Sequence, residues 1–292
     1  MSEERRVSKG WRIRGGLFAA AAVALAGGTL AAATANGPDL GAAETFAVLG
    51  GSTVTNTGLT VITGDVGVSP GTAITGFPPG IVTGGSIHAN DALAVAAHRD
   101  AAIAYLFLEG MASIPANNLS GTDLGGLTLD PGVYKFNSSA QLTGDLVLDA
   151  RGDKDALFVF QIGSTLTTAT GATVTVINGG SGSDTARVFW QIGSSATLGI
   201  NTEFTGVVIA YSSITVVSGT SIDGAALAIN GAVTLDTNVI VVPPASSGNG
   251  NGNGGNDDCD CTCHDGDGHE HGNGLGLGHC KGRGKGHDKH GN

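Results

Sequence analysis

The chain has 292 residues and a formal net charge of −11 at pH 7, and charged residues make up only 13% of it. An acidic chain repels the phosphates of nucleic acids and of anionic membrane surfaces, so both are excluded as partners. Few charged side chains also leave little material for a catalytic site, whereas 50 glycines suit short strands joined by tight turns.

The first 35 residues have the pattern of a secretory signal peptide. A basic region ending at Arg14 precedes an apolar run at 17–26, and Ala33-Thr34-Ala35 fits a small-x-small cleavage site. The run is shorter than the roughly 20 apolar residues that a membrane anchor needs. We therefore predict cleavage before Asn36 and an extracellular protein. The removed segment carries five basic and two acidic residues, so the mature chain has a net charge of −14.

Strand signals begin directly after this leader. The apolar run at 46–51 opens the domain and ends in two glycines, polar and apolar residues alternate at 53–57, and 60–68 is predicted to form two strands around Gly64-Asp65. A turn is predicted at Phe77-Pro78-Pro79-Gly80.

One segment has helical periodicity instead, and we expect a helix near Ile87–Met111. Asn90 or Ser86 is predicted to cap its start, and Pro115 blocks its extension. Its apolar positions are Leu93, Ala96, Ala97, Ile103, Ala104, Phe107 and Met111. A helix of roughly 20–25 residues is about as long as a stack of five or six strands is high, so it is expected to lie along the strands.

The segment after the helix contains an internal repeat. FVFQIGSTLT at 158–167 returns as VFWQIGSSAT at 188–197, and SSIT and GAVT repeat its second half at intervals of 18 and 19 residues, counted from Thr197 to Thr215 and on to Thr234. A period near 20 residues made of short strands is typical of a β-solenoid, whose coils stack to share a core. We expect residues 36–244 to form this one domain.

The repeat predicts an outward grid of hydroxyl groups. If Ile214, Val216, Val233 and Leu235 point inward, alternation places the residues between and before them outward. The predicted grid consists of Thr165 and Thr167, Ser195 and Thr197, Ser213 and Thr215, and Ala232 and Thr234. Thr53, Thr55, Thr57, Thr173 and Thr175 can equally belong to this grid or to another face. Threonine is also an ordinary exposed strand residue, so the pattern alone does not prove a binding surface.

The composition changes abruptly after Pro244. Residues 245–255 form a linker rich in glycine, asparagine and serine, and the rest lacks the apolar residues needed for a core. Its candidate metal ligands are Cys259, Cys261, Cys263, His264, His269, His271, His279 and Cys280. These residue types suit Zn²⁺ or Cu, although disulfide pairing in an oxidising compartment is the alternative.

Taken together, these segments resemble the bacterial and microbial ice-binding proteins of the DUF3494 family. The similarity covers about 42–242 and includes FAVLGGSTVTNTG at 46–58, ITGDVGVSPGTAITGFPPG at 62–80, LDPGVY at 129–134 and NGAVTLD at 230–236. It implies an all-β, right-handed, discontinuous β-solenoid of triangular section with one long helix alongside. It also implies secretion, and adsorption to ice through a flat threonine-rich face.

Two other function classes remain to be weighed. One is an extracellular structural or adhesion protein that does not bind ice and carries a metal-binding tail. The other is an enzyme, which we do not expect. Asp65, Asp130, Asp145 and Asp236 all lie beside turn residues, and no His/Asp/Ser constellation accompanies them. No cofactor is expected for the domain.

Overall fold

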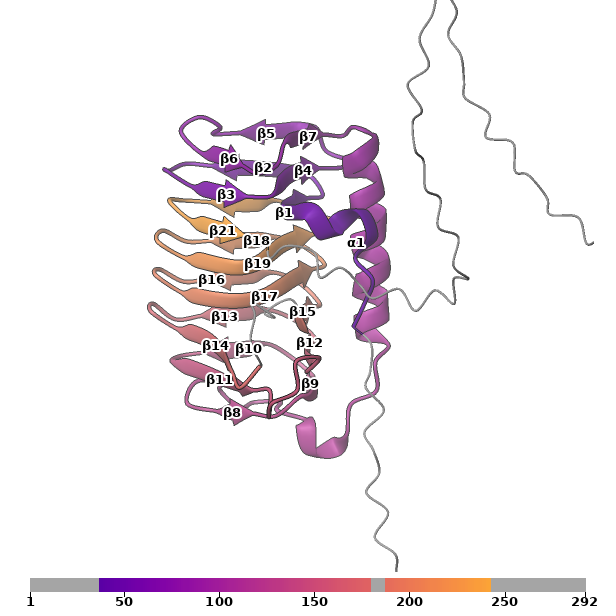
Figure 1. Ribbon diagram of the computed structural model, residues 1–292, viewed down its shortest axis with the longest axis vertical. Coiled ribbons are helices and arrows are strands. Elements are labelled where there is room, and N and C mark those ends of the chain that lie inside the picture. The colour runs from indigo at the N-terminus through magenta and orange to yellow at the C-terminus, as the bar shows by residue number, and fades with distance from the viewer. Residues whose placement is uncertain (1–36, 180–186, 243–292) are drawn as a thin grey trace, which may run out of the picture. The chain divides into compact units, whose positions relative to one another are not determined.

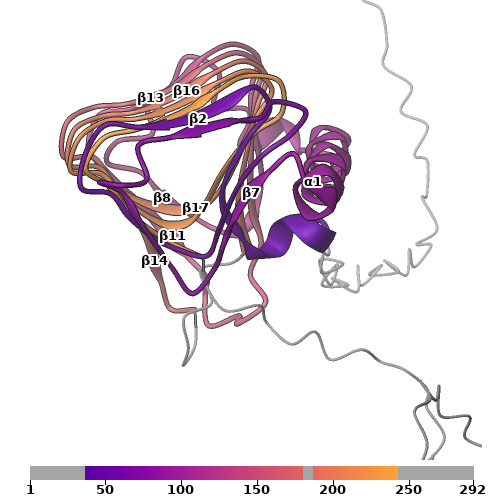
Figure 2. The same cartoon turned by 90° about the horizontal axis from the view of Figure 1, so that it is seen from above.

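A computed structural model of the protein describes residues 37–179 and 187–242. Within these ranges the strands pair in parallel and wind into coils of three sides, so the domain is triangular when viewed along its axis (Figure 2). This confirms the predicted β-solenoid. The proposed boundaries after residues 35 and 244 lie outside the described residues.

Each side of the triangle is a parallel stack of short strands. The threonine face, as we call the first, contains β10 (Ala140–Leu142), β13 (Leu166–Thr168), β16 (Ala196–Leu198), β18 (Ile214–Val216), β20 (Val233–Leu235), β2 (Thr53–Asn56) and β5 (Ala73–Thr75). The second face contains β8 (Thr128–Leu129), β11 (Asp145–Asp149), β14 (Thr173–Ile177), the first halves of β17 (Glu203–Ala210) and β19 (Ser221–Ala228), then β21 (Val239–Val241), β3 (Val61–Thr63) and β6 (Ile81–Thr83). The helix face contains β9 (Gly132–Phe136), β12 (Phe158–Ile162), β15 (Val188–Ile192), the second halves of β17 and β19, then β1 (Phe46–Gly50), β4 (Asp65–Val68) and β7 (Ile87–Ala89).

The stacking order of the coils differs from their order in the chain. The strands β1, β2 and β3 of the first coil lie between the second coil and the last one, where they pair with β19, β20 and β21 (Figure 1). The chain therefore builds one end of the stack, runs along it in the helix, and returns from the other end. This is the discontinuous arrangement that the resemblance implied, and it gives seven strands on the threonine face where five or six coils were expected.

Glycines allow two long strands to turn a corner without a break. Gly206 and Gly224 pair in register in the middle of β17 and β19, with φ angles of 116° and 143°. A Cβ atom on Gly224 would lie 2.1 Å from the carbonyl oxygen of Gly206. Only glycine fits this left-handed, crowded corner between the second face and the helix face.

The helix α1 (Ala92–Glu109) packs on the helix face, as predicted, but its start differs from the prediction and its inner side agrees with it only in part. Ile87–Ala89 is the strand β7, and Asn90 has a φ of 51°. Asp91 caps the helix instead, since its Oδ1 accepts a 2.9 Å hydrogen bond from the backbone N–H of Ala94. The short helices η1 (Gly41–Thr45) and η2 (Pro115–Asn117) flank the domain's N-terminal entry and the end of α1.

Alanines rather than large apolar residues form most of the inner side of α1. Its buried residues are Ala94, Ala97, Ala101, Ala104, Tyr105 and Leu108. Of the apolar positions that the sequence suggested, Ala97 and Ala104 are buried, whereas Leu93, Ile103 and Phe107 are exposed. Small side chains bring the helix close to the sheet, where Gln161 of β12 donates hydrogen bonds from Nε2 to the carbonyl oxygens of Leu108 and Met111 at 2.7 and 2.8 Å.

The interior of the solenoid is apolar and includes an aromatic stack. Phe160 and Trp190 pack with their ring centroids 3.9 Å apart and nearly parallel, and Tyr134 and Phe204 extend the stack on either side. Ile214, Val216, Val233 and Leu235 are buried, which confirms their predicted inward orientation. These buried residues fix the register that turns the intervening residues outward.

Candidate functional site

The threonine face carries an unbroken column of similar side chains. The central residue of each strand is set directly beside the central residue of the next by backbone pairing. In stacking order the column is Gln141, Thr167, Thr197, Thr215, Thr234, Thr55 and Thr75. Neighbouring strands are about 4.8 Å apart, so six threonines follow one another at that spacing.

The outward orientation follows from what flanks each threonine. In β18, Ile214 and Val216 are buried in the core, so Thr215 between them points away from it. The same buried, outward, buried pattern recurs in β20 around Thr234 and in β16 around Thr197. Threonine is β-branched, so its χ1 angle is restricted and the hydroxyl and methyl groups keep fixed positions.

A second row of small side chains lies two residues earlier in each coil. It contains Ser139, Thr165, Ser195, Ser213, Ala232, Thr53 and Ala73. Hydrogen bonds link several of its hydroxyl groups. Thr165 Oγ1 donates to Ser139 Oγ at 2.8 Å, and Ser213 Oγ accepts from the backbone N–H of Ala232 at 3.2 Å. Some hydroxyl groups of this row are therefore already engaged in hydrogen bonds within the protein.

The threonine column differs from this row in one respect. Among the described residues, none makes a hydrogen bond with the hydroxyl of Thr167, Thr197, Thr215, Thr234, Thr55 or Thr75. Six in-register hydroxyl groups are therefore available to an external partner, each beside its own methyl group. A regular, uncharged array of this kind suits a partner that is itself regular and can exchange hydrogen bonds.

Buried threonines at the neighbouring corner hold the face in shape. Thr168 and Thr202 share a 2.8 Å hydrogen bond between their hydroxyl groups, and Thr202 and Thr220 both donate to the carbonyl oxygen of Gly199, at 2.8 and 2.6 Å. All three threonines are buried. Because buried polar groups without partners are costly, these bonds fix the corner and with it the edge of the face.

A buried asparagine network joins the two halves of the column. Asn238 donates from Nδ2 to the carbonyl oxygen of Val217 at 2.9 Å, and its backbone N–H donates to Thr60 Oγ1 at 3.1 Å. Thr60 Oγ1 in turn donates to Asn56 Oδ1 at 2.6 Å. This network lies where the first coil meets the last, so it aligns Thr55 with Thr234 although they are distant in sequence.

The structure shows to which face the remaining threonines belong, a question that the sequence left open. Thr53 and Thr55 belong to the threonine face, in the same two rows as the predicted residues. Thr173 and Thr175 lie on the second face, where Thr173 Oγ1 donates to Asp145 Oδ1 at 2.8 Å. Thr57 follows β2 at the corner.

Sequence reasoning missed the two ends of the column. Gln141 and Thr75 were not among the predicted residues because their short segments do not repeat the QIGS motif. The signal that could have revealed the column is an outward residue between two apolar ones. Val54-Thr55-Asn56 and Ile74-Thr75 have an apolar residue on one side only, so they show this signal in part. The predicted site residues Thr165, Thr167, Ser195, Thr197, Ser213, Thr215 and Thr234 all lie on this one face.

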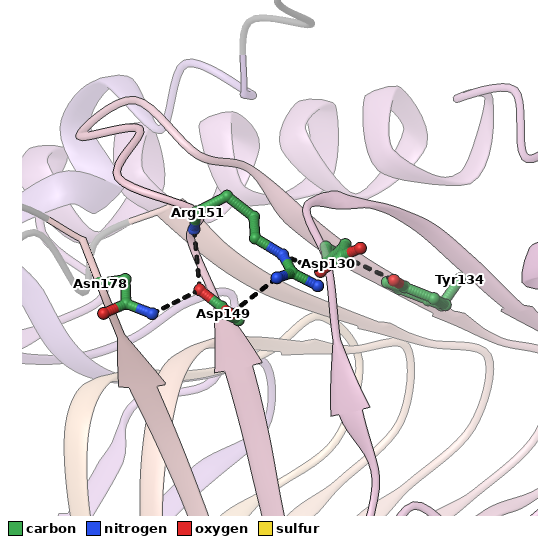
Figure 3. Close-up of polar contacts among 5 residues, drawn as sticks. All are labelled: Asp130, Tyr134, Asp149, Arg151 and Asn178. Carbon is green, nitrogen blue, oxygen red and sulfur yellow. Dashed lines mark hydrogen bonds and ion pairs between the residues drawn. The ribbon is translucent and has the colours of Figure 1, made fainter.

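A polar cluster elsewhere in the described domain links three turns of neighbouring coils. Arg151 Nε donates to Asp130 Oδ1 at 2.6 Å and Arg151 Nη1 lies 3.4 Å from Asp149 Oδ2 (Figure 3). The side-chain amide of Asn178 donates to Asp149 Oδ1 at 2.8 Å and lowers the pKa of that carboxyl below its usual value. The hydroxyl of Tyr134 donates to the backbone carbonyl oxygen of Asp130. Each of these side chains thus has a partner within the cluster.

The predicted metal ligands of the tail, from Cys259 to Cys280, lie outside the described residues. Within 37–179 and 187–242, no group of three or more His, Cys, Asp or Glu side chains is placed to hold a metal ion. The helices in these ranges include none that is long and apolar enough to cross a membrane.

Comparison with known proteins gives a consistent result. The sequence profile of the family described as ice-binding-like matches residues 48–241. The chain is 58% identical to an ice-binding protein of Nostoc sp. (strain HG1) over 202 residues, which are 69% of this chain and 72% of the relative. It is 32% identical to an ice-binding protein of Colwellia sp. over 229 residues, which are 74% of this chain and 88% of that relative.

Solved structures agree with the sequence relatives. The crystal structure of an ice-binding protein from the Antarctic ascomycete Antarctomyces psychrotrophicus superimposes with a TM-score of 0.68 at 41% identity, covering 72% of this chain and all of that one. An ice-binding protein from an Antarctic biological consortium gives a TM-score of 0.66 at 47% identity, covering 71% and 91% of the two chains.

Proposed function

The chain belongs to the ice-binding-like family, and from this premise we propose that its threonine face is the surface that adsorbs to ice. The protein's function is ice binding, as the family and its relatives indicate. The contact residues proposed are the column from Thr167 to Thr75 and the row of small residues beside it.

The observation that carries this assignment is the set of six unbonded, in-register hydroxyl groups. Each can hydrogen-bond one ordered water molecule while the adjacent methyl group lies against the same water layer. A single contact of this kind is weak, so binding requires many of them to be presented together without loss of conformational freedom. The parallel strands and restricted χ1 angles provide that preorganisation.

Adsorbed protein blocks the ice surface beneath it, which explains how a binding protein acts as an antifreeze and restrains recrystallisation. This action requires a flat surface and no chemical conversion, so we propose that the protein is not an enzyme and that its domain needs no cofactor. Export guided by residues 1–35 would place the protein where extracellular ice forms.

Purified protein tests the proposal directly. We expect it to inhibit the recrystallisation of fine-grained ice, to shape single ice crystals and to produce thermal hysteresis. If the folded protein does none of these, the ice-binding function is wrong, and an extracellular structural or adhesion role takes its place.

We also propose that the tail binds a divalent transition metal when its cysteines are reduced. The support is the density of ligands from Cys259 to Cys280, which suits Zn²⁺ or Cu. Titration of Zn²⁺ into the reduced full-length chain should show saturable binding that is lost when Cys259, Cys261 and Cys263 are replaced by serine. Equal binding by the wild type and this variant would contradict the proposal.

A further inference from the structure

The outer side of α1 is apolar, which is unusual for a helix that faces solvent. Val95, Ile103, Leu106 and Phe107 are 49, 57, 64 and 47% exposed. Apart from Arg99 and Glu109, the exposed positions of this helix are apolar. A surface helix normally carries charged residues opposite its buried side, and a helix that is apolar all round is normally buried.

The inner side of the helix is already accounted for. Its alanines, Tyr105 and Leu108 pack on the helix face, and the His98 ring nitrogen Nε2 lies 2.6 Å from the carbonyl oxygen of Ile229. Asp100 Oδ2 accepts a 3.0 Å hydrogen bond from the backbone N–H of Ala42. These contacts fix the rotation of α1 about its own axis, so the exposed apolar side chains cannot turn inward.

We propose that this outer stripe of α1 is a self-association surface, through which two copies of the protein pair their helices antiparallel about a two-fold axis. Such an interface must be self-complementary, because the same residues contribute from both copies. A pair centred between residues 104 and 105 meets this condition. It sets Ile103 of one copy against Leu106 of the other, and the reverse.

The same alignment complements charge. Arg99, whose side chain is 71% exposed, comes beside Glu109 of the other copy. Arg99 also contacts Asp100 of its own chain at 2.8 Å.

The area available predicts a weak dimer. Ile103, Leu106 and Phe107 lie within the overlap of the two helices and offer roughly 300–350 Å² per copy, and the flanking residues bring the total for both copies to about 1,000 Å². This is at the lower limit for a specific interface, so association should depend on concentration in the micromolar range or above. The threonine face lies on another side of the triangle (Figure 2), so such pairing leaves it uncovered.

Sedimentation velocity on the purified full-length chain, from about 10 µM to about 1 mM, tests the proposal. The wild type should shift from monomer to dimer as concentration rises. Ile103→Glu and Leu106→Lys place good helix-forming residues at exposed positions, so the fold should persist. Each variant alone should dimerise at least tenfold more weakly, because each buries a charge against an apolar residue.

An equimolar mixture of the two variants should regain dimer to within about threefold of the wild type, since the introduced charges then face each other. Val239→Glu on the second face, where Val239 is also half exposed, is the matched control and should dimerise like the wild type. A wild type that stays monomeric over this concentration range overturns the proposal. Dimers that persist in both single variants, or a mixture that remains monomeric, overturn it equally.

Discussion

The threonine face and the second face are built from the same coils, yet they present different surfaces to solvent. The threonine face shows a column of uncharged residues, with six threonine hydroxyls that bond nothing within the described protein. The second face mixes Asp145, Glu203 and Asp223 with valine and isoleucine, and its Thr173 and Thr205 hydroxyls are hydrogen-bonded. The backbone supplies the spacing on both faces, and the outward side chains decide which one can bind a regular surface.

The largest expected difference in activity comes from making the same substitution, threonine to tyrosine, on each of the two faces. Thr197→Tyr places a bulky ring in the flat column, so recrystallisation inhibition should fall at least tenfold. Thr175→Tyr puts the same ring at an exposed threonine on the second face, and its activity should match the wild type. Both side chains are on the surface, so the free energy of unfolding should change by less than about 0.5 kcal/mol. Equal losses in the two variants would mean that the threonine face has no special role.

The next effect concerns the network that joins the two halves of the column. Asn238→Ala removes the partners of partly buried backbone groups at Val217 and Asp236, so the free energy of unfolding should fall by roughly 1–3 kcal/mol. Calorimetry should show a lower midpoint, by roughly 2–4 °C per kcal/mol for a domain of this size. An unchanged midpoint would show that the coils join without this network.

Much of this comparison could be predicted from the sequence, because it depends on local alternation. The repeat fixed Ile214, Val216, Val233 and Leu235 as inward and Thr215 and Thr234 as outward, and the burial of the first four confirms it. The pairing of Thr55 with Thr234 was beyond such reasoning, since no local pattern reveals that the first coil stacks on the last.

The helix shows the same limit in another form. Its existence followed from periodicity, and so did the inward positions of Ala97 and Ala104. The exposure of Leu93, Ile103 and Phe107 did not, because large apolar residues look more like core residues than alanines do. Close approach to a sheet favours small residues, and this tertiary effect outweighs side-chain hydrophobicity. The cap at Asp91 was missed for a related reason, since the strand β7 occupies the first part of the expected helix.

A smaller effect separates the hydroxyl from the methyl group within the column. Thr215→Val keeps the shape and the β-branch but removes the hydroxyl, so activity should fall several-fold rather than be lost. Thr175→Val is the control and should retain full activity. If Thr215→Val is as active as the wild type, the methyl groups alone account for contact at this position.

The smallest effect is the response to pH. The pKa of Asp91 is lowered chiefly by the Ala94 backbone N–H, that of Asp100 by the Ala42 N–H and that of Asp149 by the Asn178 amide. Each of these carboxyl groups has a lower pKa in the folded state than in the unfolded state, so its ionised form stabilises the fold above about pH 4. This stabilisation is lost as the pH falls through the folded-state pKa values.

The two rows of the threonine face carry no titratable side chain. Recrystallisation inhibition should therefore stay constant from about pH 5 to about pH 8, while the thermal midpoint falls only below about pH 4. A change in activity between pH 5 and 8 at constant stability would place a titratable group in the contact surface and count against this face.

The central claim is that ice meets the threonine face, and adsorption itself tests it most directly. Fluorescently labelled wild type, Thr215→Tyr and Thr175→Tyr can each be offered to a slowly growing single crystal of ice, and the protein incorporated into the crystal measured. We predict that the wild type and Thr175→Tyr are incorporated alike and that Thr215→Tyr remains in the liquid. Incorporation of Thr215→Tyr at the wild-type level, with loss of Thr175→Tyr, would place the ice contact on the second face and contradict the account.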